Sequence, residues 1–434
     1  MWSGGNSSSN NNFMATIATT PRCAVPLNST PAAEYLASEF SLSSPNLSPT
    51  RFLTEEEHYR LAVLIPPDSP AADEGIPARY SALRDLIMTY DLDPFEYSDE
   101  DLCDLAAAIF YHYGIPQMFK IPESRLRAFV RTVRDSYRSS DEVIFHNFKH
   151  VYNVLHLAFH LLKSGVDQKL TAFDVFALLV AALCHDMDHP GVSNSFMISS
   201  HSDLANLYSN DSVLERHHAY LVRRLLLFGG RNARSGVGDV GVGGSSPSPS
   251  KVGAGDSSGG STDILCGLNS DDRRHFIGLV THAILATDMT HHMKKVEYFQ
   301  SRSAFADARE TSDLQRKELL RGILHTVDIG AQSHATPLAA RWGRIVGQEF
   351  SAQYEKEIKL GLPPSLFMAD LGEEHKLALL QSGFVANIVL PLWTAVADSF
   401  PNLQPRVLQL HENLHYYLSK VPPSILSPPS SPLG

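Results

Sequence analysis

Cysteine is scarce in this 434-residue chain, and its four cysteines stand far apart. Cys23, Cys103, Cys184 and Cys266 include no pair in a C-x-x-C arrangement. This spacing argues against a cysteine-based zinc site and against a scaffold held together by disulfides. The cysteine content therefore favours a reducing compartment.

Long hydrophobic runs are also missing. No uninterrupted apolar run reaches the roughly 18 residues that a transmembrane helix requires, so we predict no such helix. The start of the chain lacks the basic and apolar regions of a secretory signal. Its Ser, Thr and Asn content weakly resembles an organelle transit peptide, but we favour plain disorder. We expect a cytoplasmic protein, with peripheral attachment to membranes as an open alternative.

Positive charge is in deficit, because Lys and Arg number 36 against 47 Asp and Glu, for a net charge of −11. The charges are spread along the chain and form no basic stripe of the kind that binds nucleic acid. We therefore predict no nucleic-acid partner. A polyanionic substrate would need local positive charge, which bound metals can supply.

Composition divides the chain into segments. Residues 1–50 are polar and aperiodic, which predicts a disordered N-terminal tail, and 51–79 read as a linker or an extra helix. Residues 80–420 form the predicted catalytic domain, followed by a flexible C-terminal tail at 421–434. Residues 229–262 are rich in Gly, Ser and Pro, so we expect a disordered insertion into this one domain.

The central region has the apolar periodicity of helices, and alternating strand patterns are rare. We predict an all-α fold, a compact multi-helix domain. The expected helices span 99–113, 123–137, 146–163, 172–186, 212–227, 271–289, 314–327, 338–360 and 376–399.

The most informative motif, at 183–191, follows one buried apolar helix and reads Leu-Cys-His-Asp-Met-Asp-His-Pro-Gly. His185 and Asp186 supply one nitrogen and one oxygen donor, and His189 lies one turn further. Burying these groups without a cation costs several kcal/mol. The donor types suit zinc, iron, manganese or magnesium. A structural polar cap at the helix end is the alternative.

Two further features join this motif. His146 and His150 are spaced i, i+4, so we expect both on one helical face, although an exposed histidine pair would look the same. Asp328 follows another apolar helix and by itself reads as a helix-end residue. Together, His150, His185, Asp186 and Asp328 would make a site of two imidazoles and two carboxylates, the ligand mix of a hydrolytic zinc site.

The order of six motifs over about 240 residues resembles the catalytic domain of class I 3′,5′-cyclic-nucleotide phosphodiesterases. The motifs are HNxxH at 146–150, HDxDHPGVSN at 185–194, SVLExHH at 212–218, ATDM at 286–289, HTxDI at 325–329 and QxGF at 381–384. The resemblance covers about residues 80–420 and implies an all-helical His-Asp metallohydrolase of this type.

The resemblance implies a role for each matching residue. The zinc ligands would be His150, His185, Asp186 and Asp328, with Asp186 bridging to a second metal, Mg²⁺ or Mn²⁺. His189, Glu215 and Thr287 would orient the waters bound to the metals. His146 would donate a proton to the leaving oxygen. Gln381 would hydrogen-bond the purine, between Phe384 and Val346 as the two sides of a hydrophobic clamp.

The chain departs from the family pattern at a few positions. Ala331 stands where members that prefer cyclic AMP often have Asn. Alanine at this position weakly favours cyclic GMP as the substrate, or use of both nucleotides. Phe145 replaces a common Tyr, and Lys149 is unusual before the metal histidine. We also expect His291 and His292 to be solvated.

The predicted activity is metal-dependent hydrolysis of the 3′ phosphoester bond of cyclic AMP, cyclic GMP or both to the 5′-monophosphate, which would end cyclic-nucleotide signals. A His-Asp phosphohydrolase acting on nucleoside triphosphates or cyclic dinucleotides is the first rival, against which the segment at 381–384 argues. A sensor with a decayed site is the second, but all four predicted ligands are present. The oligomeric state stays open, with a homodimer as one option.

Overall fold

A computed structural model describes residues 76–229, 261–301 and 312–426, which contain helices and no strand. The α-helices are α4 (Ala78–Ser81), α5 (Arg84–Met88), α6 (Asp99–His112), α7 (Ile115–Met118), α8 (Glu123–Arg134), α9 (Phe148–Leu161), α10 (Ala172–Cys184), α11 (Asn194–Ser199), α12 (Asp203–Leu207), α13 (Val213–Phe228), α14 (Ser270–Leu285), α15 (His292–Gln300), α16 (Asp313–Asp328), α17 (Thr336–Leu360), α18 (Glu374–Phe384), α19 (Leu390–Ser399), α20 (Gln404–Ser419) and α21 (Pro423–Leu426). The predicted all-α fold is confirmed.

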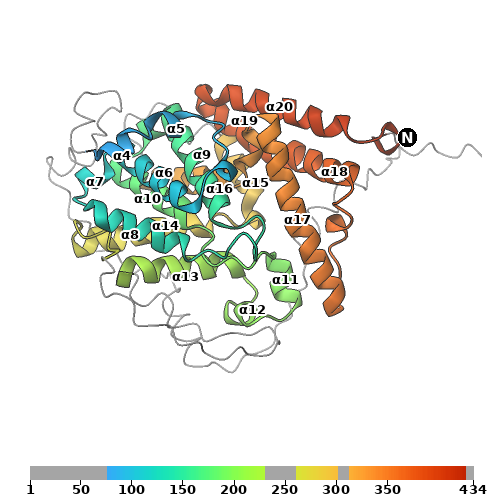
Figure 1. Cartoon of the computed structure of the whole chain (residues 1–434), viewed down its shortest axis with the longest axis horizontal. Helices are drawn as coiled ribbons and strands as arrows, with labels where there is room; N and C mark the ends of the chain where they lie inside the picture. Colours follow the sequence, from blue (N-terminus) through green and yellow to red (C-terminus); the bar gives the residue numbers. More distant parts are fainter. Residues whose placement is uncertain (1–75, 230–260, 302–311, 427–434) are drawn as a thin grey trace, which may run out of the picture.

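Helix α10 forms the centre of the core. All of its residues are buried, which follows from a sequence that is apolar on every face. A capping box between Thr171 and Asp174 starts the helix by satisfying free backbone N–H groups. It packs against α9, α14 and α16 (Figure 1). The motif that follows α10 therefore emerges from the most buried part of the molecule.

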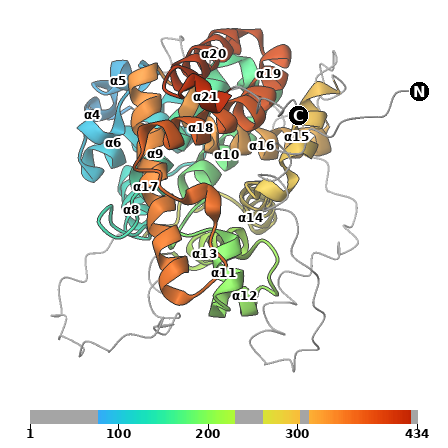
Figure 2. The same cartoon turned by 90° about the vertical axis from the view of Figure 1, so that its right-hand side faces the viewer.

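Helix α17 runs along one side of this core, beside α11 and α18 (Figures 1 and 2). Helices α18 and α19 are joined by a π-helical turn, Val385–Val389, and both pack against α20. The continuous stretch Glu374–Ser399 is long and apolar enough to cross a membrane by length and composition alone. Half of its most apolar window is buried within the fold, as in a core helix.

Several boundaries differ from the expectation. Helix α9 begins at Phe148 rather than at 146, because the Asn147 side chain accepts a hydrogen bond from the Lys149 N–H and caps the helix. Helix α10 ends at Cys184, two residues early. Short helices such as α11, α12 and α15 were not among those expected, since a few residues give no clear apolar period.

Most of the predicted segment divisions fall outside the described residues. The N-terminal tail, the linker up to residue 75, the insertion at 230–260 and the residues after 426 lie outside the described residues. Val421, at the start of the predicted C-terminal tail, is buried in the main core.

Candidate active site

Three helices bring the four predicted metal ligands together. His150 lies on α9, His185 and Asp186 follow α10, and Asp328 is the last residue of α16. The two imidazole Nε2 atoms lie 3.1–3.5 Å from one carboxylate oxygen of each aspartate. One donor atom from each of the four lies within 4.8 Å of the others. Residues 178 positions apart in the chain thus form one compact donor group.

The donor group fits a divalent metal. Ligands about 2.1 Å from a tetrahedral zinc lie about 3.4 Å from one another, close to the separations found here. Nε2 of His150 is buried and has no hydrogen-bond partner. Burial lowers the pKa of His150, so this imidazole is neutral, as a ligand must be. A cation at the centre would satisfy an otherwise unpaired nitrogen.

The surrounding backbone holds these side chains in position. Nδ1 of His185 donates to the Ala182 carbonyl at 2.9 Å, which turns Nε2 toward the aspartates. The Asp186 N–H donates to the Tyr137 hydroxyl, which in turn donates to the Leu183 carbonyl. Such outer contacts fix ligand orientation in metal sites.

His146 lies in a turn just before α9, and its partner is Glu349 of α17. Its Nδ1 donates to Oε1 of Glu349, whose Oε2 accepts the N–H groups of Phe145 and His146 at 2.7 and 3.1 Å. Burial disfavours the charged imidazole, but the Glu349 carboxylate outweighs it and raises the pKa of His146 to about 9. Burial likewise opposes ionisation of Glu349, yet His146 lowers its pKa to about 2. The pair is therefore ionic at neutral pH. Glu349 was not among the site residues predicted from the sequence.

His189 covers the other side of His146. The two rings stack with centroids 4.0 Å apart, and the Gly191 N–H donates to Nδ1 of His189 at 3.1 Å. Burial and then the charge of His146 hold the pKa of His189 well below its usual range. The neutral ring of His189 thus stacks on the charged ring of His146. The turn that follows His189 requires a positive φ, and Gly191 adopts one of 69°.

His217 and His218 are both buried. Nδ1 of His218 donates to the Met187 carbonyl, and its Nε2 lies 3.6 Å from Oδ1 of Asp186. Burial lowers the pKa of His218 to about 4. Nε2 of His217 lies 3.0 Å from Oδ2 of Asp188, and Oδ1 of Asp188 accepts a hydrogen bond from Arg138. The backbone of Asp188 has a left-handed conformation. These contacts fix the loop that carries Asp186 from its outer side.

The remaining predicted water-orienting residues lie on neighbouring elements. Asn194 donates to both carboxylate oxygens of Glu215 at 2.9–3.2 Å. Burial and then Asp288 raise the pKa of Glu215 to about 7. The hydroxyl of Thr287 donates to the Ile284 carbonyl, at the end of α14.

Comparison with known proteins identifies the family. The family model for 3'5'-cyclic nucleotide phosphodiesterase matches residues 145–236 and 256–410, which include the four predicted metal ligands, His146 and Glu349. The chain belongs to this family of phosphodiesterases. The resemblance seen in the sequence is confirmed.

Individual relatives agree with the family assignment. The 3',5'-cyclic-nucleotide phosphodiesterase regA of Dictyostelium discoideum is 29% identical over 72% of this chain and 35% of its own length. A cGMP-specific 3',5'-cyclic phosphodiesterase of Drosophila melanogaster is 29% identical over 74% of this chain and 26% of its own length. The chain thus spans about a third or less of these relatives. The crystal structure of the phosphodiesterase domain of the RhoPDE fusion protein from the choanoflagellate Salpingoeca rosetta has a TM-score of 0.68 and 28% identity, covering 80% of this chain and 100% of that one.

The predicted base-binding residues of this phosphodiesterase lie on α17 and α18. Gln381 is buried; its Nε2 donates to the Gly343 carbonyl and its Oε1 accepts from Gln332, both at 3.3 Å. The Tyr417 hydroxyl donates to Gln332 at 2.9 Å and holds it in place. Phe384 ends α18 one turn beyond Gln381, and both it and Val346 of α17 are partly exposed. Gln332 and Tyr417 were not anticipated, because their partners are distant in sequence.

Three departures from the family pattern gain a structural account. The Phe145 ring lies edge to face with the His146 ring, with centroids 4.7 Å apart. It is tilted against the His150 ring, with centroids 4.6 Å apart. Ala331 is buried in a small apolar cluster, which Phe145 joins. Lys149 points elsewhere, because its ammonium donates to the Pro94 and Tyr97 carbonyls.

One expectation in this region is wrong. His292 is buried rather than solvated, and its Nδ1 lies 3.0 Å from Nε2 of His325 on α16. His291, by contrast, is exposed as expected. The sequence could not show which of two adjacent histidines faces the next helix, because α15 was not predicted.

Proposed function

We propose that this chain hydrolyses the 3′ phosphoester bond of cyclic AMP, cyclic GMP or both and releases the 5′-monophosphate. The observation that carries the proposal is the position of the His146–Glu349 ion pair next to the donor group of His150, His185, Asp186 and Asp328. A proton donor beside a divalent-metal site is what phosphodiester cleavage requires. Family membership supports the substrate class.

We further propose that His150, His185, Asp186 and Asp328 would hold zinc, and that Asp186 would also contribute to a site for Mg²⁺ or Mn²⁺. Oδ2 of Asp186 faces His150 and His185, whereas Oδ1 lies toward His218, so its two oxygens face different sides. Asp186, His189 and His218 form a second buried group of metal-ligand type. When bound, two such metals would lower the pKa of a water toward about 7 and neutralise phosphoryl charge.

His146 then acts as the general acid. Its Nδ1 is held by Glu349, so the proton on Nε2 is the one available to the leaving O3′ oxygen. As a water oxygen bonds to phosphorus and the P–O3′ bond breaks, that proton passes to O3′. The proton that the attacking water loses goes to solvent, which returns one to the neutral ring. Such catalysis contributes roughly 10²–10⁴-fold to the rate. Glu215, His189 and Thr287 are proposed to orient the waters around the metals.

Gln381 is proposed to hydrogen-bond the purine, with Phe384 and Val346 on its two faces. Stacking on an aromatic ring contributes about 1–3 kcal/mol per base. The buried methyl of Ala331 offers the base no hydrogen bond, and the fly relatives are cGMP-specific by name. Both points favour cyclic GMP or dual use over strict cyclic AMP selectivity.

The deciding experiment measures product formation from cyclic AMP and cyclic GMP side by side, with Mg²⁺ or Mn²⁺ and then with a chelator. We expect 5′-monophosphate from at least one substrate and loss of the activity on chelation. The ratio of the two kcat/KM values gives the base preference. Absence of turnover by the metal-loaded protein would defeat the proposal, and turnover of a nucleoside triphosphate or cyclic dinucleotide instead would favour the rival phosphohydrolase.

Location and assembly remain predictions. The three cysteines in the described residues, Cys103, Cys184 and Cys266, are free thiols, which fits the expected cytoplasmic environment. A homodimer is one option for assembly.

A further inference from the structure

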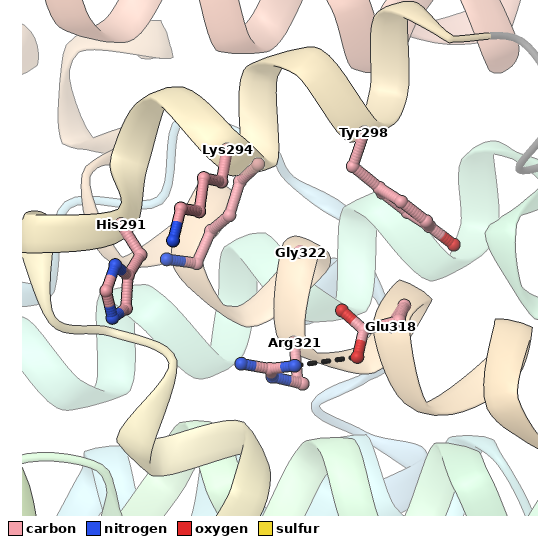
Figure 3. A pocket seen from close by; sticks show the side chains of 7 residues that line it. His291, Lys294, Tyr298, Glu318, Arg321 and Gly322 are labelled. Carbon is pink, nitrogen blue, oxygen red and sulfur yellow. Dashed lines mark hydrogen bonds and ion pairs between the residues drawn. The ribbon is translucent and has the colours of Figure 1, made fainter.

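A pocket of about 290 Å³ lies between α15 and α16, apart from every residue assigned to hydrolysis (Figure 3). Its lining includes His291, Lys294, Lys295, Tyr298, Glu318 and Arg321. The volume is near the lower end of small-molecule sites, which hold about 300–1,000 Å³. The pocket is therefore of a size for one small ligand.

Two helix contacts shape this pocket. A side-chain carbon at Gly322 of α16 would come within 2.5 Å of the Phe299 ring, so glycine is what lets α15 approach α16 this closely. The buried pair His292 and His325 joins the same two helices nearby. Because packing fixes both walls, the charged side chains between them face a preformed space.

The charges in the pocket do not balance. Glu318 is the only carboxylate of its lining, and it is already paired with Arg321 at 2.6 Å. Lys294 and Lys295 form no ion pair within the described residues. Lys295 is half-buried, and its burial followed by the charge of Arg321 lowers its pKa to about 8. Asp288, Glu318 and Asp328 attract Lys295 without forming an ion pair with it, so a bound anion would supply the direct partner that this partly desolvated cation lacks.

The side chains are arranged to hold an anion. Lys294 and His291 come from the α15 side of the pocket and Arg321 from α16, so that their nitrogen atoms face a shared space (Figure 3). Tyr298 places an aromatic ring at the other end of the pocket. Phosphate is a common partner of both groups, because the guanidinium binds it through two parallel N–H groups and the ammonium binds it as a point charge. In a chain with a net charge of −11, this cationic pocket stands out.

We propose that this pocket binds a small phosphate monoester, with the phosphate on Lys294, Lys295 and Arg321 and the organic part against Tyr298. It is a second ligand site, separate from the metal group, and does not depend on the proposed hydrolysis.

Phenyl phosphate is the probe that tests this site, since it joins a phosphate dianion to a ring for Tyr298. It is titrated into the metal-loaded full chain and followed by calorimetry and phosphorus NMR. We expect saturable binding that the double variant K294Q/K295Q weakens by about tenfold or more, because the substitutions remove two charge-assisted contacts to the phosphate. The matched control K356Q/K359Q removes two exposed lysines of α17 and should bind like the unmodified protein.

Binding in the metal site is distinguished by D328N, which should leave the affinity for phenyl phosphate unchanged. Binding lost in D328N but kept in K294Q/K295Q would overturn the proposal, as would failure to saturate at millimolar probe. If the double variant does not fold, K294Q alone changes an exposed residue and should still weaken binding several-fold. Equal affinity for phenyl phosphate in K294Q and the unmodified protein would then count against the site.

Discussion

Among single residues, Glu349 controls both the position and the protonation of the proposed proton donor, His146. It accepts three hydrogen bonds from Phe145 and His146, so it fixes both the backbone turn and the ring that donates the proton. Its carboxylate also raises the pKa of His146 to about 9, against the effect of burial. A proton donor must be both positioned and protonated, and one carboxylate provides for both.

Replacement of Glu349 should therefore alter the pH profile as well as the rate. In Glu349→Gln, the pKa of His146 loses its largest upward contribution, so the protonated form is lost at a lower pH. We expect kcat to fall roughly 10–100-fold and the alkaline limb of the kcat profile to move to lower pH. Glu355→Gln, an exposed carboxylate on the same helix, is the control and should change neither. An alkaline limb that stays in place would contradict the role of Glu349.

The metal content of variant proteins should distinguish the proposed proton donor from the proposed metal ligands. His146→Ala should lower kcat by roughly 10²–10⁴-fold while elemental analysis finds the metal content of the unmodified protein. Asp328→Asn should lose both metal and activity, because a neutral amide replaces a charged ligand. Metal loss in His146→Ala would make His146 a ligand, and full activity of Asp328→Asn would defeat the four-ligand site.

The sequence was informative at this scale where donors are adjacent or follow a clear helix. His185 and Asp186 could be predicted because they directly follow a fully apolar segment. Glu349 was missed because its partner is 203 residues away. A signal was present: an acidic residue on the same face of the predicted helix at 338–360 as Trp342 and Val346 indicates a buried partner.

At the scale of elements, close approach of helices positions the base-binding residues. A side-chain carbon at Gly343 of α17 would lie 2.8 Å from the Tyr417 hydroxyl and 3.1 Å from Cδ of Gln381. The Tyr417 hydroxyl also donates a hydrogen bond to Oε1 of Gln332, and Nε2 of Gln332 donates one to Oε1 of Gln381. The contact of α17, α18 and α20 at this glycine therefore sets where the Gln381 amide points.

Gly343→Ala should consequently impair substrate recognition. We expect a higher KM for cyclic nucleotides and a loss of about 1–3 kcal/mol in the free energy of unfolding, from overpacking. Gly278→Ala is the matched control, since nothing lies within 4 Å of its added carbon and alanine is the better helix former by about 1 kcal/mol. Denaturant unfolding and steady-state kinetics on both variants test this; an unchanged KM in Gly343→Ala would show that the contact does not position Gln381.

Helix types could be predicted more reliably than their ends. Amphipathic periods gave α6, α8, α13 and α17 because several turns repeat one pattern. The i, i+4 spacing of His146 and His150 suggested one helical face, but Asn147 caps the helix and leaves His146 outside it. The two rings still lie 5.5 Å apart, because Glu349 and the stacked His189 hold His146 from outside the helix.

For the whole molecule, the fold brings distant segments to a single donor group around the end of α10. The sequence predicted the helices and, through the family resemblance, the ligand set. It did not predict which helices pack on α10, since apolar faces match in many ways and only the assembled core selects α9, α14 and α16.

Deletion within the segment between α13 and α14 would show whether that segment contributes to the fold. The family match is interrupted between residues 236 and 256. On either side of the undescribed residues, the fold brings the chain back to one place: a side-chain carbon at Gly229 would lie 3.1 Å from Oγ1 of Thr262. Deletion of 231–260 with a short Gly/Ser linker should therefore leave the unfolding temperature and kcat/KM close to those of the full chain. A shorter flexible connection loses less entropy on closure, by about 0.6 kcal/mol for each halving of its length. A deletion variant that unfolds, while the same linker inserted beside the intact segment is tolerated, would show that these residues contribute to the fold.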